Sequence, residues 1–179
     1  EIYFSVRYFT TGNFIKFQNN TKRTDTIPCP YYFIHKISQF INNQKITSVA
    51  DLGSGYGRVT NSLSIATKAT IIGYEIDKEI CDISIKNKNS NVTIENKDIL
   101  NIDYKNLKVE CFIYSDVFRN EIDLENLIKK IEFSRTNLTK KYYIIIINVD
   151  KTKMHVFNNY KLLKFTPASQ SRYIKFFSN

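Results

Sequence analysis

Apolar and polar positions form alternating blocks along this chain, and the blocks predict strands and helices in turn. Short apolar runs are typical of strands with both faces buried, and apolar positions every three to four residues are typical of helices. The expected strands span 45–51, 69–75, 91–98, 109–116 and 142–149. The expected helices span 31–42, 59–68 and 122–137, with a further helix after Asp77. Strands and helices that alternate in this way predict an α/β fold with a parallel sheet.

Both ends of the chain depart from this alternation. Residues 2–17 mix aromatic and β-branched residues around Thr-Thr-Gly-Asn, which predicts a short hairpin or an irregular arm, with a helix as the competing interpretation. Residues 160–165 and 171–177 predict a terminal antiparallel strand pair. No linker interrupts the chain, so we expect an N-terminal arm over 1–25 and a single domain over 26–179.

Two of the expected helices have a clear apolar side. Asp77 suits an N-cap, because its short acidic side chain can accept a hydrogen bond from the first helical turn. The expected buried side of the helix after it consists of Ile80, Cys81, Ile83 and Ile85. The helix over 122–137 is the most clearly amphipathic, with Ile122, Leu124, Leu127, Ile128, Ile131 and Phe133 as its apolar positions. We expect both helices to cover the sheet.

The first strand ends in Asp51-Leu52-Gly53-Ser54-Gly55-Tyr56-Gly57-Arg58, a pattern typical of a nucleotide-binding turn. Glycines suit such a turn because they allow positive φ and leave no Cβ between backbone N–H groups and a ligand. The dinucleotide pattern is G-x-G-x-x-G, and the position that should be its third glycine is Arg58. The sequence therefore disfavours NAD.

Carboxylates follow four consecutive strands at the edge where a doubly wound sheet binds its ligands. Glu75 could accept hydrogen bonds from two adjacent ribose hydroxyls, and its charge would repel a phosphate. Asp98 is placed to receive the exocyclic amine of adenine, and Asp51 would favour a ligand that carries an ammonium and a sulfonium. With Asp116 after the fourth strand, this set predicts S-adenosylmethionine as the cofactor.

From about Thr26 to the C-terminus, the chain resembles the class I S-adenosylmethionine-dependent methyltransferases. The resemblance rests on four ordered segments, 49–57, 73–77, 96–99 and 112–116. It implies a Rossmann-like, doubly wound, mostly parallel seven-stranded sheet with a C-terminal antiparallel strand pair. It also implies an enzyme that transfers a methyl group from S-adenosylmethionine.

The same resemblance implies roles for individual residues. The methionine part of the cofactor would lie at Asp51 and the glycine turn, the ribose at Glu75, and the adenine at Asp98 with its neighbour. The implied cofactor-binding residues are Asp51, Gly53, Ser54, Gly55, Tyr56, Gly57, Glu75, Ile76, Asp98, Ile99 and Ser115. Ser115 and Asp116 would border the substrate pocket. Asp116 is the candidate catalytic residue that receives or steers the acceptor's proton, and a structural capping role explains it equally well.

The methyl acceptor is open at this stage. Thr26-Ile27-Pro28 and the wording of the glycine turn look most like small protein-lysine methyltransferases of the archaeal and mitochondrial type, which usually have Asp-Gly-Arg at Tyr56-Gly57-Arg58. We expect a macromolecular acceptor, with protein lysine slightly ahead of RNA and a small molecule as a further alternative. A nucleic-acid-binding subunit that keeps the fold without transferring methyl groups is the alternative of another class.

Composition narrows the setting. The chain has 179 residues, 42% of them hydrophobic, which is enough for one domain with a full core. Its three cysteines are odd in number and not in ligand spacing, so we expect no metal site and no disulfide, and a cytoplasmic protein. Its apolar runs are shorter than the roughly 20 residues of a membrane span. The net charge of +9 favours polyanionic partners, although a lysine-, asparagine- and isoleucine-rich composition also follows from an A+T-rich genome.

Overall fold

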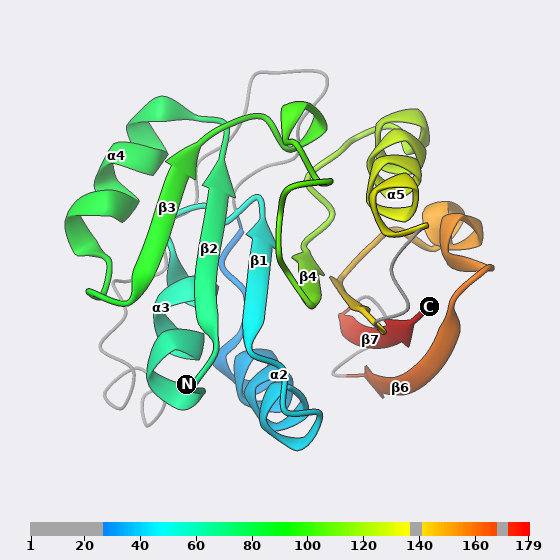
Figure 1. The fold of residues 1–179 in the computed structure, drawn as a ribbon, viewed down its shortest axis with the longest axis horizontal. Helices are drawn as coiled ribbons and strands as arrows, with labels where there is room; N and C mark the ends of the chain where they lie inside the picture. Colours follow the sequence, from blue (N-terminus) through cyan, green and yellow to red (C-terminus); the bar gives the residue numbers. More distant parts are fainter. Residues whose placement is uncertain (1–26, 137–140, 168–171) are drawn as a thin grey trace.

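The computed structural model describes residues 27–136, 141–167 and 172–179, and the arm and hairpin predicted within residues 1–25 lie outside them. Its centre is a seven-stranded sheet in the order β3-β2-β1-β4-β5-β7-β6 (Figure 1). The strands are β1 Ser48–Leu52, β2 Thr70–Glu75, β3 Val92–Asn96, β4 Cys111–Tyr114, β5 Tyr143–Ile147, β6 Lys161–Pro167 and β7 Tyr173–Ser178. β1 to β5 are mutually parallel, and β7 is antiparallel to both β5 and β6. The predicted fold is confirmed.

The predicted helices are present with small shifts in their ends. They are α2 Tyr31–Asn43, α3 Arg58–Ala66, α4 Lys78–Asn87 and α5 Glu121–Arg135, with the 3-10 segments η1 Ile99–Asn101 and η2 Lys151–Phe157. Asp77 is the N-cap of α4, as predicted, because its carboxylate accepts a hydrogen bond from the Ile80 N–H at 3.1 Å. Within the described ranges, no helix combines the length and the apolar character needed to cross a membrane.

Helices cover both faces of the sheet because its central strands β4 and β5 are apolar and buried at every position. On one face, α2 and α3 pack against residues such as Val49 and Ile145. On the other face, α5, η1 and η2 pack against residues such as Ala50 and Ile144. All five residues of β5 are buried, which confirms the prediction of a central strand covered on both sides. This packing leaves the edge at the carboxyl ends of the parallel strands for a site.

Three apolar residues expected on buried helix faces are exposed instead. Ile85 is 41% exposed, Ile122 66% and Phe133 79%. A helix turns about 100° per residue, so Ile122 and Phe133 lie roughly opposite the buried stripe of α5. That stripe consists of Leu124, Leu127, Ile128 and Ile131. In α4 the buried position next to Cys81 on the inner side is Ser84, and Ile85 points outward.

Candidate functional site

The glycine turn after β1 has the backbone that its sequence predicts. Gly53, Gly55 and Gly57 all have positive φ, at 87°, 54° and 81°. A Cβ on Gly53 would lie 2.3 Å from Cγ1 of Val117, and a Cβ on Gly57 would lie 2.6 Å from Oγ of Ser84. The turn therefore needs glycine both for its backbone angles and because the segment after β4 and helix α4 lie directly against it.

Glu75, the last residue of β2, holds this turn in place. One carboxylate oxygen accepts the Gly55 N–H at 2.9 Å, and the other accepts the Asp77 N–H at 2.8 Å. The side chain is buried, and burial raises the pKa of Glu75 although the two N–H groups act in the opposite direction. A carboxylate offers about four lone-pair positions. Glu75 can therefore brace the turn and still accept hydrogen bonds from a ligand.

Asp51 brings an uncompensated polar atom to the same place. It is 2% exposed, and its Oδ2 has no hydrogen-bond partner among the described residues. Burial, together with the negative charge of Glu75, raises the pKa of Asp51 to about 7. The buried hydroxyl of Ser54 also lacks a hydrogen-bond partner in the described part of the chain. A buried acceptor without a donor costs about 1–3 kcal/mol, so a cationic donor from a ligand would stabilise this arrangement.

The residues predicted to contact adenine lie next to this carboxylate pair, at the ends of β2 and β3. Asp98 Oδ1 accepts the Leu100 N–H at 2.9 Å and caps η1. Ile99 is buried in the core, whereas Ile76 is 46% exposed and presents apolar surface at the sheet edge. The Asn96 amide donates to the carbonyls of Glu75 and Ile76 at 2.9 and 3.0 Å, which ties the two strand ends together. Sequence reasoning did not identify Asn96.

On the other side of the turn, Asp116 forms a partly buried ion pair that sequence reasoning also missed. Asp116 follows β4 and Ser115 with a φ of 20°. Its Oδ1 lies 2.8 Å from the Lys153 ammonium, and its Oδ2 accepts the Asp150 N–H at 3.0 Å. Lys153 is 7% exposed and also donates to the Phe118 carbonyl at 2.6 Å. The candidate proton acceptor is therefore bound to an ammonium group from η2.

Arg58, the residue that argued against a dinucleotide, has a packing role. It is buried, its guanidinium carbon lies 4.7 Å from the centre of the Tyr31 ring, and its Nη1 lies 3.5 Å from the Cys29 carbonyl oxygen. These contacts connect the proline-rich segment before α2 to the start of α3. Tyr31 is 2% exposed and belongs to the core.

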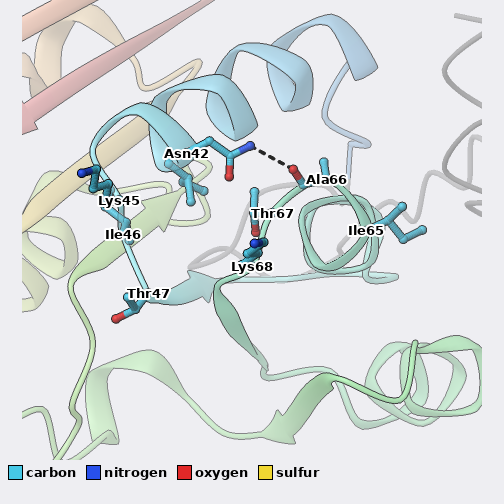
Figure 2. Close-up of a pocket in the computed structure, with 9 residues that line it drawn as sticks. Asn42, Lys45, Ile46, Thr47, Ile65, Ala66, Thr67 and Lys68 are labelled. Carbon is cyan, nitrogen blue, oxygen red and sulfur yellow. Dashed lines mark hydrogen bonds between the residues drawn. The ribbon is translucent and has the colours of Figure 1, made fainter.

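A pocket of about 570 Å³ lies at the opposite edge of the sheet. Figure 2 shows it between the end of α2 and the end of α3, where the Asn42 amide donates to the Ala66 carbonyl at 3.0 Å. It is lined by Ile41, Asn42, Lys45, Ile46, Thr47, Ile65, Ala66, Thr67 and Lys68. Thr47 and Lys68 precede β1 and β2, so this pocket lies at the amino ends of the strands, away from Asp51 and Glu75.

Comparison with curated proteins adds one similar sequence. No protein-family profile matches the chain. Over 106 residues the chain is 30% identical to ribosomal RNA small subunit methyltransferase A of Hydrogenobaculum sp. (strain Y04AAS1), which is 55% of this chain and 42% of that protein. The matched region thus spans less than half of the curated relative.

Comparison with solved structures identifies the fold. RNA methyltransferase from Salinibacter ruber, in complex with S-adenosyl-L-homocysteine, has a TM-score of 0.63 at 14% identity, covering 85% of this chain and 93% of its own. Magnesium protoporphyrin IX methyltransferase from Synechocystis PCC 6803, with bound SAM, has 0.63 at 11% identity, with coverages of 82% and 77%. N-methyltransferase NodS from Bradyrhizobium japonicum has 0.64 at 8% identity, with coverages of 83% and 96%. The chain therefore has the fold of the class I S-adenosylmethionine-dependent methyltransferases.

Proposed function

We propose that this chain is an S-adenosylmethionine-dependent methyltransferase that binds its cofactor at the carboxyl ends of β1, β2 and β3. The observation that carries the proposal is the buried Asp51 carboxylate, whose Oδ2 has no hydrogen-bond partner in the described ranges, beside the glycine turn braced by Glu75. An acceptor-only carboxylate in a buried turn suits the ammonium end of this cofactor and disfavours a phosphate. The fold is the one on which such cofactors are bound in the similar structures with SAM or S-adenosyl-L-homocysteine.

The cofactor would supply an electrophilic methyl group, which an acceptor attacks in line with the departing sulfur. The task of the protein is then to align the two reactants and exclude water. Asp51 and the backbone of the turn would hold the methionine part, Glu75 would accept the ribose hydroxyls, and Asp98 with Ile76 would border the adenine. Asp116 would receive or steer the proton that the acceptor loses, and Lys153 would have to move with it.

For the acceptor, we place RNA first. The curated protein that resembles the chain is a ribosomal RNA methyltransferase, and its match covers more than half of this sequence. Protein lysine is the second candidate, because the sequence of the glycine turn slightly favoured it. A small molecule is the third. All three require the same cofactor site, so the cofactor and the acceptor are tested separately.

Calorimetric titration with S-adenosylmethionine tests the cofactor site. We expect saturable binding to the wild type and at least a tenfold loss of affinity in Glu75→Gln, which keeps the size of the side chain but removes its charge. Glu95→Gln is the matched control, because Glu95 lies on the neighbouring strand and pairs with Lys97 at the surface at 2.6 Å. Absence of binding heat in the wild type would contradict the proposal and favour the non-catalytic subunit. Equal affinities in Glu75→Gln and wild type would contradict the proposed place of the cofactor.

Labelling with tritiated cofactor tests the acceptor. The chain is incubated with cell lysate and labelled cofactor, and the products are digested separately with RNase and with protease. Label that RNase releases and protease spares supports RNA. Label that protease alone releases identifies protein. Label in a small molecule that chromatography separates from S-adenosylmethionine, and that is absent with the control variant, identifies a small-molecule acceptor. Asp51→Asn serves as the matched inactive control.

A further inference from the structure

The positive charge of the chain is concentrated in its last part. Residues 26–136 contain fourteen Lys and Arg and fourteen Asp and Glu, and are therefore neutral. Residues 137–179 contain eight Lys and Arg against the single acidic residue Asp150. Most of the net charge of +9 thus belongs to the segment that forms β5, η2, β6 and β7. An asymmetry of this kind indicates a region that contacts a polyanion.

β6 is the outermost strand of the sheet (Figure 1). It carries part of this charge next to exposed apolar side chains. Lys161 and Lys164 are exposed, and their register partners on β7 place them on the same face of the sheet. Phe165 projects on the other face beside its register partner Lys175, whose ammonium lies 5.6 Å from the centre of the Phe165 ring. We call Lys161, Lys164, Phe165 and Lys175 the β6–β7 surface.

The β6–β7 surface continues toward the candidate acceptor side of the site. Tyr173, at the start of β7, lies beside Phe165 with its ring centre 5.9 Å away. Its hydroxyl donates to the Val149 carbonyl and its N–H to the Asn148 side chain, both just beyond the carboxyl end of β5. Asp150 and Asp116, the next residues along this edge, are joined by a hydrogen bond of 3.0 Å. A chain bound along β6 would therefore lead to the Asp116 side of the sheet edge.

Protection of a sheet edge against aggregation accounts for lysines on β6 but not for the apolar side chains beside them. Phe165 is 50% exposed and Leu162 is 49% exposed. Among the described residues, no carboxylate forms an ion pair with Lys161, Lys164 or Lys175. Uncompensated ammonium groups beside an exposed aromatic ring are the combination that binds the phosphates and the unstacked bases of a single strand.

We propose that the β6–β7 surface binds single-stranded nucleic acid, with phosphates at Lys161 and Lys164 on one side of the edge and a base against Phe165 on the other. This inference rests on the proposed function, in which RNA is the leading acceptor. The strand held on β6 is then the acceptor strand, and the surface selects it by charge and stacking before it reaches the site. A duplex fits less well, because its bases are not available to Phe165.

Fluorescence anisotropy with a labelled single-stranded uridine oligonucleotide, without cofactor, tests the surface in the full chain. Lys161→Gln/Lys164→Gln should reduce the slope of log affinity against log salt by about 1.4, because each lost phosphate contact on a single strand contributes about 0.7. Phe165→Ala should weaken binding at least about fivefold and leave the salt slope unchanged. The matched control is Lys68→Gln/Lys86→Gln, two exposed lysines on other parts of the molecule, which should bind like wild type.

The inference would be overturned if the wild type did not bind, or if the control pair lost as much affinity as Lys161→Gln/Lys164→Gln. It would also be overturned if Phe165→Ala bound like wild type, or if polyglutamate of equal charge displaced the oligonucleotide. Tighter binding of a duplex of equal length would also overturn it. Calorimetry with S-adenosylmethionine on the same variants separates this inference from the proposed function. If the chain binds the cofactor but not the oligonucleotide, the inference about the β6–β7 surface is wrong and the proposed function stands. If the oligonucleotide binds through the β6–β7 surface but the chain binds no cofactor, only the proposed function is wrong.

Discussion

The two halves of the carboxyl edge of the sheet are built in different ways. Around β1 and β2, a carboxylate holds the backbone of the turn: Glu75 accepts the N–H groups of Gly55, 20 residues earlier, and of Asp77, two residues later. Around β4 and β5, side chains from distant segments meet, as when Lys153 reaches Asp116, 37 residues away. The first half is acidic and buried, whereas the second continues into the basic β6–β7 surface. In the proposed function, the first half binds the cofactor through buried carboxylates and the glycine turn, and the second half selects the acceptor through exposed side chains.

The largest expected effect is a loss of stability that comes from the second half alone. Lys153→Met removes the ammonium from the Asp116 ion pair, in which the two side chains are 8% and 19% exposed, and leaves a poorly solvated carboxylate. Loss of one partner of such a pair costs about 3–4 kcal/mol of unfolding free energy. Urea denaturation measures the loss. The affinity for S-adenosylmethionine should stay within about twofold, because Glu75 is held by the N–H groups of Gly55 and Asp77 and not by the pair.

The matched control for Lys153→Met is the double variant Lys153→Met/Asp116→Asn, which removes both charges. It should recover most of the lost stability, with a remainder from the Phe118 carbonyl, which loses its Lys153 donor. If Lys153→Met unfolds with the wild-type free energy, the ion pair does not organise this half.

The next effect concerns pH and the first half. The pKa of Asp51 is about 7 in the folded chain against an ordinary 3.8, so the folded chain binds this proton more tightly than the unfolded chain. Through this group, stability therefore falls as pH rises from about 4 to about 7. Between pH 4 and pH 8, the difference in unfolding free energy between Asp51→Asn and wild type should shift by about 3 kcal/mol in favour of the variant. Denaturation at both pH values, without cofactor, measures it.

Glu95→Gln, at the surface of the neighbouring strand, should show no such shift and is the control. Parallel pH profiles of Asp51→Asn and wild type would contradict a pKa of Asp51 that burial and Glu75 raise in the folded chain. The contrast between a buried acidic half and a half that continues into a basic surface would then be weaker.

A contact between the halves gives the third effect. Gly53→Ala places a Cβ at a φ of 87° and 2.3 Å from Cγ1 of Val117, the residue after Asp116. The strained backbone and the clash should together lower the unfolding free energy by about 2 kcal/mol. Val117→Ala removes the clashing methyl. The double variant Gly53→Ala/Val117→Ala should therefore lose less unfolding free energy than the two single variants lose together. Additive losses in this double-mutant cycle would show that the two halves do not touch here.

The same contrast explains what the sequence could predict. Gly53, Gly55 and Gly57 could be recognised because few residues adopt positive φ, and Asp77 because few side chains cap a helix well; the parallel order followed from alternating strands and helices. Lys153 could not be recognised, because nothing near it in the sequence marks a buried lysine. Ile122 and Phe133 were misplaced because apolar composition was counted without their angle around the helix.

The smallest expected effect is the loss of a helix cap, and each half has one cap that can be removed. Asp77 caps α4 through the Ile80 N–H at 3.1 Å, and Asn120 caps α5 through the Asp123 N–H at 2.8 Å. Replacement of either by Ala should cost about 1 kcal/mol of unfolding free energy, since both lose one N-cap hydrogen bond. Only Asp77→Ala should weaken S-adenosylmethionine binding, severalfold by calorimetry, because loss of the cap loosens the first turn of α4, and the backbone N–H of residue 77 at its start holds the Glu75 carboxylate.

Asn120→Ala is thus the matched control for Asp77→Ala, with the same chemistry at the start of a helix that belongs to the acceptor half. Equal stability losses with unequal cofactor affinities would show that the first half couples its helix cap to the ligand through Glu75. Equal affinities in the two variants would show that Glu75 keeps its position without the side-chain cap of α4. Cofactor binding in the first half would then depend on the glycine turn and not on the start of α4. A substitution could then lower the stability of this half without lowering its cofactor affinity, as we expect for Lys153→Met in the second half.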